Sequence, residues 1–281
     1  MIYNSIMFFN ELDLLEIRLY ELESVVDKFI IVEATTTHSG MNKELHYANN
    51  RDRFVRFSDK IIHIVVDDMP MGHQPLELGM PENGLVRPGK GITDAMAEVR
   101  ERHQRNSGMR GMAGCRDEDI VIVTDADEIP RATSIPDRID GDRVCRFSMN
   151  EYDGYINRQG AESGIIYIYG AANFNTVRKL GVDGIKQCHR GYHNVTTIPN
   201  GGWHFSWVGG VEAMVTKIES FLHQELNVPQ FKDRNRLTNV IESPNDLTQV
   251  PGRQYRFVAL DDTYPEYVMR HTAKFKHLIY E

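Results

Sequence analysis

The amino-acid sequence predicts an α/β fold, in which a mostly parallel central sheet is flanked by helices on both faces. Apolar runs at residues 29–32, 61–66 and 120–123 have the length of short buried strands, and they lack the polar-apolar alternation of a solvent-facing sheet. Segments with helical periodicity separate these runs, as in a chain of β-α-β units. Hydrophobic residues make up 41% of the 281 residues and charged residues 26%, which is ordinary for a globular protein.

The elements of the first half follow in order from their patterns. Leucines at positions 12, 15, 19 and 22 recur at helical spacing and predict a helix. The elements expected after it are a strand at 25–34, a short charged helix at 50–57, a strand at 61–66, a polar, arginine-rich helix at 93–112 and a strand at 119–124. Four prolines and five glycines between residues 69 and 91 indicate a long loop, which we expect to form a mobile flap near the strand ends.

The second half is predicted to be more antiparallel. Strands are expected at residues 143–149 and 165–169, and a turn is expected at Asn200-Gly201-Gly202. Apolar residues between Val211 and Leu226 recur on one face of a long predicted helix. We interpret that face as part of the core, without a chemical role.

The clearest chemical feature comes at the end of the strand at 119–124. Asp125 and Asp127 occupy positions i and i+2, so an extended backbone places both carboxylates on the same side. At about 4 Å two such charges repel by roughly 4 kcal/mol at an effective dielectric near 20. A divalent cation, Mn²⁺ or Mg²⁺, would relieve this repulsion and keep positions open for phosphate oxygens. The alternative is a solvated acidic turn that caps the strand.

Two further segments are candidates for ligand contacts. Arg105 lies on the polar helix before the acidic strand, and a guanidinium group suits phosphate or ribose oxygens. Taken alone, however, that segment is explained by i,i+4 ion pairs on an exposed helix.

Both tryptophans, Trp203 and Trp207, lie within five residues around His204. Tryptophan faces stack on sugars or bases and a histidine can complete a metal shell, whereas a core aromatic cluster is the alternative.

Several separate stretches of the chain form one ordered pattern. They are residues 9–19, 29–34, 37–40 with Lys43, 104–106, 124–130 and 201–206, with 223–225 as a fainter match. In their order and spacing these stretches resemble family 17 of the glycosyltransferases. The resemblance implies a GT-A-like, nucleotide-sugar-binding fold and metal-dependent transfer of a sugar with inversion at the anomeric carbon. It also implies a UDP-sugar donor, UDP-N-acetylglucosamine being the one we expect, and a glycan or other sugar-containing acceptor.

The resemblance also implies a domain organisation. Residues 1–245 would form the GT-A-like domain, with a nucleotide-binding half at 1–130. The half at 131–245 would hold the acceptor and the metal in a smaller antiparallel part. Residues 246–281 would be a C-terminal extension packed on the same domain.

Roles for individual residues follow from the same resemblance. Donor binding is expected of Glu33, His38, Lys43, Arg105, Asn106, Asp125 and Ala126. The expected ligands of Mn²⁺ (or Mg²⁺) are Asp125, Asp127 and His204. Inversion in one step needs a general base near the acceptor hydroxyl. The candidates are Asp183, ranked first, then Asp153, then Glu151 and Glu212. Candidates for an acceptor platform are Tyr152, Tyr155, Trp203 and Trp207.

Two other functions fit parts of the pattern. A D-x-D phosphohydrolase would use Asp125 as nucleophile and Asp127 as acid, although that motif usually stands near the N-terminus. A non-catalytic nucleotide-sugar-binding protein would keep the site without turnover. The first would release phosphate from a generic phosphomonoester, and the second would bind UDP without releasing sugar.

Charge and cysteine content limit the remaining classes. The net charge is −8 and the basic residues are scattered, which disfavours a nucleic-acid partner. Three widely spaced cysteines suit free thiols in a reducing compartment. No stretch approaches the roughly 18–20 apolar residues of a transmembrane helix, and the N-terminus has no basic leader segment. We therefore expect a cytoplasmic protein.

Overall fold

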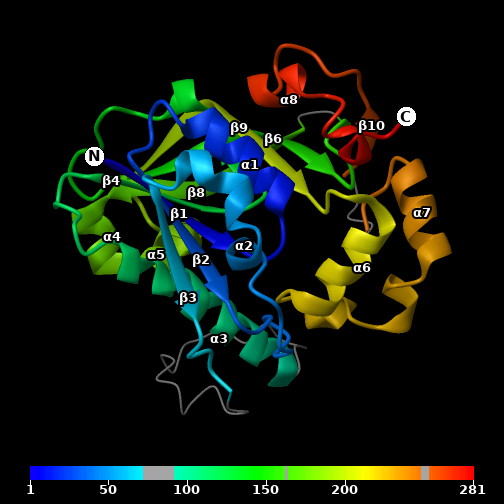
Figure 1. The fold of residues 1–281 in the computed structure, drawn as a ribbon, viewed down its shortest axis with the longest axis horizontal. Coiled ribbons are helices and arrows are strands. Elements are labelled where there is room, and N and C mark those ends of the chain that lie inside the picture. Colours follow the sequence, from blue (N-terminus) through cyan, green and yellow to red (C-terminus); the bar gives the residue numbers. More distant parts are fainter. Residues whose placement is uncertain (72–91, 162–163, 248–252) are drawn as a thin grey trace.

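The computed structural model describes residues 1–71, 92–161, 164–247 and 253–281. These residues form a ten-stranded sheet with the order β10-β7-β6-β8-β4-β1-β2-β3, to which β9 is added beside β6 and β5 beside β9. The strands are β1 (Ile2–Phe8), β2 (Lys28–Ala34), β3 (Ile61–Val66), β4 (Ile120–Asp125), β5 (Glu128–Pro130), β6 (Val144–Asp153), β7 (Arg158–Gly160), β8 (Ile165–Asn173), β9 (Val195–Ser206) and β10 (Tyr255–Phe257). The predicted α/β architecture, with a sheet flanked by helices, is confirmed (Figure 1).

The parallel part of the sheet contains the strands of the first half. β1 pairs with both β2 and β4, and β2 pairs with β3, all in parallel. The sequence pattern does not predict β1, because polar residues interrupt its apolar run. Asn4 is nevertheless buried, since it donates to the Ile122 carbonyl at 3.2 Å and accepts from Arg18 at 3.1 Å. A buried polar side chain with partners of this kind is tolerated inside a sheet.

Beyond β4 the sheet becomes mixed. β8 is antiparallel to β4 and to β6, whereas β9 runs parallel to β6 and antiparallel to the short β5. The predicted strands at 143–149 and 165–169 correspond to the first parts of β6 and β8.

The turn predicted at residues 200–202 is wrong, because these residues lie inside β9. The register between β6 and β9 shifts there, and Asn200 and Gly202 have φ values of 49° and 137°. A Cβ on Gly202 would lie 2.1 Å from the Ile129 carbonyl oxygen, so only glycine allows this close approach of β9 to β5. The irregularity lets β9 continue to Ser206 and places His204 opposite Glu128.

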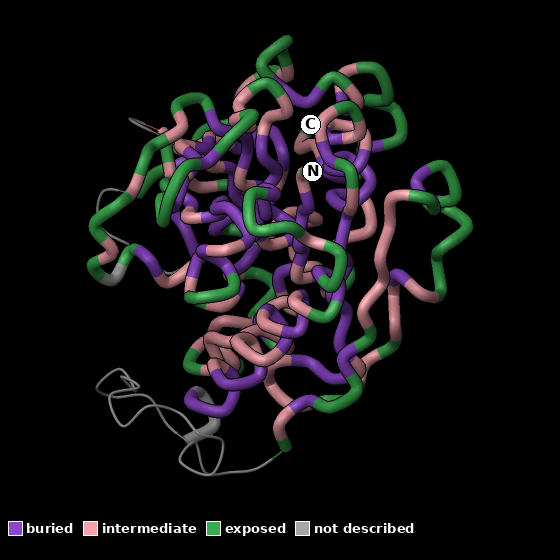
Figure 2. Tube along the Cα trace, turned by 90° about the vertical axis from the view of Figure 1, so that its left-hand side faces the viewer, coloured by how far each residue is buried: buried purple, intermediate pink, exposed green. Residues whose placement is uncertain are grey.

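Helices cover both faces of the parallel strands (Figure 1). They are α1 (Leu12–Leu22), α2 (His46–Asn49), α3 (Ile92–Ser107), α4 (Phe174–Leu180), α5 (Val182–Lys186), α6 (Gly210–Ser220), α7 (Arg234–Glu242) and α8 (Glu266–Arg270). On one face α1 and the 3₁₀ helix Arg51–Phe57 pack against Ile6 and Phe29. On the other face α4 and α5 pack against Val121 and Val123, and α3 lies against β2. Figure 2 shows buried segments running through the middle of the molecule, with exposed segments mainly at its outer turns.

The C-terminal segment packs on the strands that follow the acidic turn. Tyr264 and Val268 share a cluster with Tyr152 and Trp203, and the Trp203 indole N–H donates to the Thr263 carbonyl at 3.0 Å. The three cysteines are free. In the described part of the chain, no helix combines the length and apolar character needed to cross a membrane. Residues 72–91 of the expected flap lie outside the described residues.

Candidate active site

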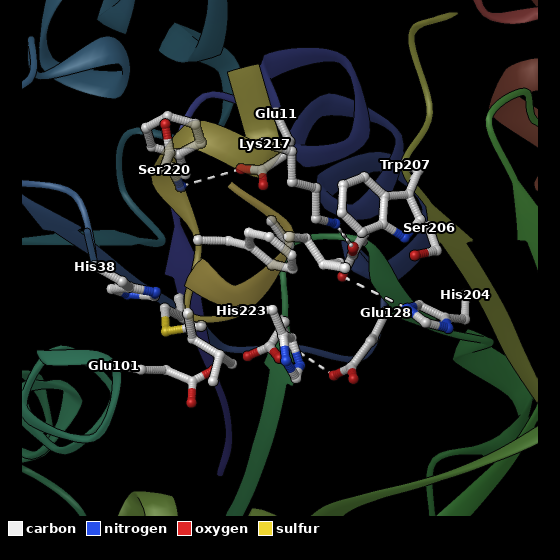
Figure 3. A pocket seen from close by; sticks show the side chains of 18 of the residues that line it. Glu11, His38, Glu101, Glu128, His204, Ser206, Trp207, Lys217, Ser220 and His223 are labelled. Atoms are coloured by element: carbon white, nitrogen blue, oxygen red, sulfur yellow. Dashed lines mark hydrogen bonds and ion pairs between the residues drawn. The ribbon is translucent and has the colours of Figure 1, made fainter. Parts of the chain in front are cut away.

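A cavity of about 470 Å³ opens at the carboxyl ends of β1, β2 and β4. Its walls come from the residues after these strands, from β6 and β9, and from α6 with the segment that follows it. Figure 3 shows His38 and Glu101 at one end of the cavity and His204, Ser206 and Trp207 at the other. Since ligands of open α/β sheets bind beyond the carboxyl ends of the strands, this cavity is the candidate active site.

Among the described residues that line the cavity, acids outnumber lysines and arginines. Among its described lining residues are the carboxylic acids Glu11, Glu101, Asp125, Asp127, Glu128, Glu151, Asp153, Glu225 and Asp246. The lysines and arginines lining the same walls are Lys43, Lys217 and Arg253. An anionic ligand can enter such a site only with additional positive charge, because close carboxylates would repel it.

A buried arginine holds the turn that carries Asp125 and Asp127. Arg18 of α1 donates to the backbone carbonyls of Asp125, Ala126 (3.3 Å) and Glu128 (2.6 Å), and to the Thr124 hydroxyl at 2.6 Å. Its side chain is fully buried, and burial lowers the pKa of Arg18 to about 10, so that it stays charged at neutral pH. One guanidinium group therefore fixes the backbone of the whole turn. Sequence reasoning missed Arg18, because the spacing of the leucines shows which face of the helix is buried but not which partner a charged residue on that helix has.

Asp125 is neutralised by two side chains from other elements. Its carboxylate lies 3.2 Å from Arg105 of α3 and 3.7 Å from Lys186 of α5. Although burial acts to raise the pKa of Asp125, the charges of Arg105 and Lys186 hold it well below its usual range. Lys186 also pairs with Glu128, whose carboxylate accepts from the Asp125 backbone N–H at 2.8 Å. Arg105, predicted to bind the donor, thus holds the acidic turn and does not itself line the cavity.

Asp127 and His204 both line the cavity and face each other. The Asp127 carboxylate lies 3.9 Å from Nε2 of His204, and its other oxygen accepts from the Lys217 ammonium at 2.8 Å. Burial acts to raise the pKa of Asp127, but Lys217 and His204 lower it below the usual value. The backbone reinforces this placement, because the Phe205 N–H donates to the Asp127 carbonyl at 2.8 Å.

The arrangement of Asp127 and His204 fits one side of a divalent-cation site. Within the described residues, the buried Nδ1 of His204 has no hydrogen-bond partner. Its Nε2 points toward the Asp127 carboxylate at a separation that leaves room for an ion between them. Asp125, the third expected ligand, is instead engaged by Arg105 and Lys186, and the described part of the chain contains no assembled group of three possible metal ligands. Two protein ligands are enough for Mn²⁺ or Mg²⁺ when water and phosphate oxygens complete the shell.

Three donor-binding residues were predicted in and after β2. The structure places His38 and Lys43 in the cavity wall but not Glu33. His38 lines the cavity, and its Nε2 is 2.8 Å from the Gln104 side chain, which itself donates to the carbonyls of Phe8 in β1 and Val32 in β2. Lys43 also lines the cavity and lies 3.8 Å from Glu33. Glu33 does not line it: the carboxylate is buried, accepts from the Tyr47 N–H at 2.8 Å and pairs with His63 at 3.0 Å. Glu33 therefore holds the start of α2 from a position outside the cavity lining.

Asn106 and Asp183 form a structural unit beside the cavity. Oδ1 of Asn106 accepts from the Asp183 backbone N–H at 2.9 Å and so holds the first turn of α5. The Asp183 carboxylate accepts from Arg105 at 2.6 Å and lies 3.5 Å from Arg102. Neither residue lines the cavity, and both oxygens of Asp183 face arginines. This position does not favour Asp183 as the base that receives a proton from an acceptor.

Asp153, by contrast, lines the cavity from the end of β6. Burial raises the pKa of Asp153 to about 6, even though Arg158 at 2.8 Å acts to lower it. Glu151, two residues earlier on the same strand, also lines the cavity and stands opposite His204 in the β6–β9 register. Glu212 is instead exposed and paired with Arg234.

The four aromatic candidates for the acceptor platform lie in different environments. Trp203 is fully buried beneath Arg131, and Tyr152 lies in the same core cluster. Among the four platform candidates, only Trp207 is a described lining residue of the cavity. The long helix predicted over residues 211–226 ends at Ser220. Phe221, Leu222 and Leu226 after it line the cavity, and Leu226 also packs against the core cluster of α6 and α7.

Glu11 and Lys217 are lining residues that sequence reasoning missed. Glu11 precedes α1, and one of its oxygens accepts from the Phe9 and Asn10 backbone N–H groups at 3.0 Å. Burial raises the pKa of Glu11, and the neighbouring charge of Asp127 raises it further. The signal that could have indicated Glu11 was its place in the stretch 9–19, which belongs to the pattern that resembles the family. Lys217 lies on the same helix as the apolar face interpreted as core but is not part of that face.

Comparison with known proteins assigns the chain to a family. A model of glycosyltransferase family 17 matches residues 1–146, which is just over half of the chain. The chain belongs to glycosyltransferase family 17. The matched part of this family 17 glycosyltransferase includes Arg18, Asp125 and Asp127, so the clamped acidic turn lies inside it.

Relatives extend the similarity beyond the matched part. The beta-1,4-mannosyl-glycoprotein 4-beta-N-acetylglucosaminyltransferase of Rattus norvegicus is 21% identical over 325 aligned residues, covering 99% of this chain and 54% of that protein. The protein of the same name from Homo sapiens is 22% identical, covering 95% of this chain and 50% of its own length. This family 17 chain thus spans about half the length of the curated relatives it matches.

Proposed function

We propose that this family 17 glycosyltransferase transfers N-acetylglucosamine from UDP-N-acetylglucosamine to a sugar-containing acceptor, with inversion and with Mn²⁺ or Mg²⁺, on a GT-A-like fold. The observation that carries the proposal is the clamped turn of Asp125 and Asp127 at the mouth of an acidic cavity, with His204 facing Asp127. The names of the relatives support the sugar, since those proteins are N-acetylglucosaminyltransferases.

The donor would lie across the ends of β1, β2 and β4. The uridine end fits the wall made by His38, Lys43 and Ala126, where Gln104 holds the His38 ring in place. The diphosphate would face the acidic turn, which brings it next to Asp127 and Lys217. Asp125 would act from the same turn, with its charge balanced by Arg105.

Asp127 and His204 would hold the divalent cation. When bound, the cation neutralises the diphosphate and stabilises the charge that develops on the departing UDP. The chain's own contribution is to keep Asp127 in place through the Arg18 clamp and to present the His204 imidazole from β9. This requirement for added positive charge agrees with the many carboxylates on the cavity walls.

The acceptor would enter from the side of β6 and Trp207, where we propose Asp153 as the general base. The acceptor hydroxyl oxygen forms a bond to the anomeric carbon while the bond from that carbon to the diphosphate oxygen breaks. The Asp153 carboxylate takes the hydroxyl proton, and UDP leaves with the electron pair. Attack on the face opposite the diphosphate accounts for inversion.

Asp153 leads to a testable pH dependence. Because burial raises its pKa to about 6, the carboxyl is protonated below that pH and cannot accept a proton. We expect kcat/KM to fall as the pH drops through about 6, and Asp153→Asn to lower kcat/KM by about 10²–10⁴-fold and to remove this acidic limb. Asp183→Asn is the matched comparison and should keep the limb, since Asp183 faces arginines outside the cavity. Loss of the limb in Asp183→Asn alone would return the role of base to Asp183.

A thermal-shift panel tests the proposed function itself. A ligand that binds the native state at 100 times its dissociation constant adds about 2.7 kcal/mol to the free energy of unfolding, which raises the melting temperature measurably. We expect UDP and UDP-N-acetylglucosamine to stabilise the protein with Mn²⁺ present and much less without it. GDP and CDP are the matched controls and should give smaller shifts. Equal stabilisation by every diphosphate, or none by UDP with Mn²⁺, would refute the assignment.

A further inference from the structure

Lys217 spans the cavity to reach the acidic turn. It lies on α6, and its ammonium group donates to the Asp127 carboxylate at 2.8 Å while resting 5.2 Å from the centre of the Trp207 ring (Figure 3). The carboxylates of Glu11 and Asp125 also attract this ammonium. A lysine carries three N–H donors on a flexible four-carbon chain, so one hydrogen bond leaves donors for another ligand.

The other lysine and arginine side chains that line the cavity each contact more than one group of the protein. Lys43 donates to the Glu44 carbonyl at 3.0 Å and lies beside Glu33, and Arg253 lies 3.6 Å from Asp246 and 3.9 Å from Glu151. Within the described part of the chain, the one hydrogen bond that Lys217 makes goes to Asp127. Lys217 thus holds one oxygen, Oδ2, of the carboxylate whose other oxygen, Oδ1, faces His204 and is assigned to the divalent cation by the proposed function.

A divalent cation at Oδ1 and the ammonium group at Oδ2 would repel each other across the same carboxylate. Both are positive, and both would lie within about 4 Å of the same carboxylate, where their mutual repulsion is strong. Entry of a diphosphate between them would change the balance, because its oxygens can accept from the ammonium while they also bind the cation. The ammonium needs only a side-chain rotation to follow them, and the Trp207 face offers it a second contact during that movement.

We propose that Lys217 holds Asp127 in the empty site and becomes a ligand of the donor diphosphate in the loaded one. This inference rests on the proposed function, because it requires a divalent cation and a nucleoside diphosphate in this cavity. It gives Lys217 two opposite effects. Lys217 weakens the binding of the cation alone, and it strengthens the binding of the diphosphate once the cation is present.

Two binding measurements separate these effects without turnover. Mn²⁺ alone is titrated into the full chain and followed by electron paramagnetic resonance, and UDP is titrated at saturating Mn²⁺ by calorimetry. For Lys217→Met we expect Mn²⁺ to bind several-fold more tightly and UDP to bind about tenfold or more weakly, as expected for loss of a hydrogen bond between charged groups. Lys217→Gln should change both affinities in the same directions. Lys217→Arg keeps the charge and should stay within about threefold of the wild type for UDP.

Lys232→Met is the matched control. Lys232 is also paired with a carboxylate, Glu219 at 2.9 Å, but it does not line the cavity, so both affinities should stay unchanged. Circular dichroism and the melting temperature establish that each variant is folded. If Lys217→Met and Lys217→Gln weaken both ligands, or change neither, the inference about Lys217 is wrong while the proposed function stands. If the wild type binds neither Mn²⁺ nor UDP, both are wrong.

Discussion

Replacing Asp127 by alanine is expected to lower kcat/KM for UDP-N-acetylglucosamine by about 10²–10³-fold, measured as UDP release with Mn²⁺ present. The physical reason is that Asp127 is the carboxylate that faces His204, so its removal takes one of two proposed cation ligands away from the developing charge on UDP. The variant also frees Lys217 from its ion pair, but the ammonium alone carries one positive charge and cannot replace a divalent cation. Mn²⁺ affinity should fall together with the rate.

The matched control for this change is Asp117→Ala. Asp117 is an exposed acid paired with Arg178 on the outside of the molecule, and its removal should leave both the rate and the Mn²⁺ dependence unchanged. Full turnover by Asp127→Ala with an unaltered Mn²⁺ dependence would show that the cation is bound elsewhere.

Replacing Arg18 by methionine is expected to lower the free energy of unfolding by about 3–5 kcal/mol, measured by urea denaturation with circular dichroism. Arg18 is fully buried and donates to the carbonyls of Asp125, Ala126 and Glu128. Without it, these carbonyls lose their buried donor, and the carboxylates of the turn lose the positive charge beneath them. Arg18→Lys keeps the charge but not the fork of donors, so it should be destabilised less and still lose activity.

Arg56→Met provides the comparison for Arg18→Met. Arg56 is exposed and forms a bidentate pair with Glu23 at the surface, where water replaces the lost contacts, so its urea midpoint should stay close to that of the wild type. A wild-type midpoint for Arg18→Met would mean that the turn does not depend on the buried guanidinium.

The turn of Asp125 and Asp127 was predictable because its pattern is local. A buried apolar strand that ends in two acids at i and i+2 places both near the edge of a sheet, whatever the rest of the chain does. His204 was recognisable for a similar reason, since two glycines and two tryptophans around a histidine are unusual. In the first half α1, β2, β3, α3 and β4 follow from periodicity in the same way, whereas β1, α2 and β5 were not predicted. In β1, the polar Asn4 is buried because it donates to the Ile122 carbonyl and accepts from Arg18 of another element.

The partner of each charged side chain was not predictable, and it decided what each residue does. Glu33, Arg105, Asn106 and Asp183 all lie in or near segments that the pattern assigned to the donor or the acceptor. The structure pairs Glu33 with His63 and with the N–H groups of α2, and it pairs Arg105 with both Asp125 and Asp183. Sequence spacing carries no information about such contacts, because a charge is neutralised by whichever opposite charge the fold brings within a few ångströms.

By itself, therefore, the sequence determined the α/β architecture and the acidic turn, because each depends on residues close together in the chain. It also marked His204, although the contact between His204 and Asp127 was expected only from the family resemblance. Only the tertiary structure decided that Arg18 donates to the carbonyls of that turn and that Lys217 donates to the Asp127 carboxylate. It also decided that Asp153 lines the cavity while Asp183 does not. These contacts join residues separated by tens to more than a hundred positions. They exist only once the sheet has assembled and its helices have packed on it, which is why no local pattern records them.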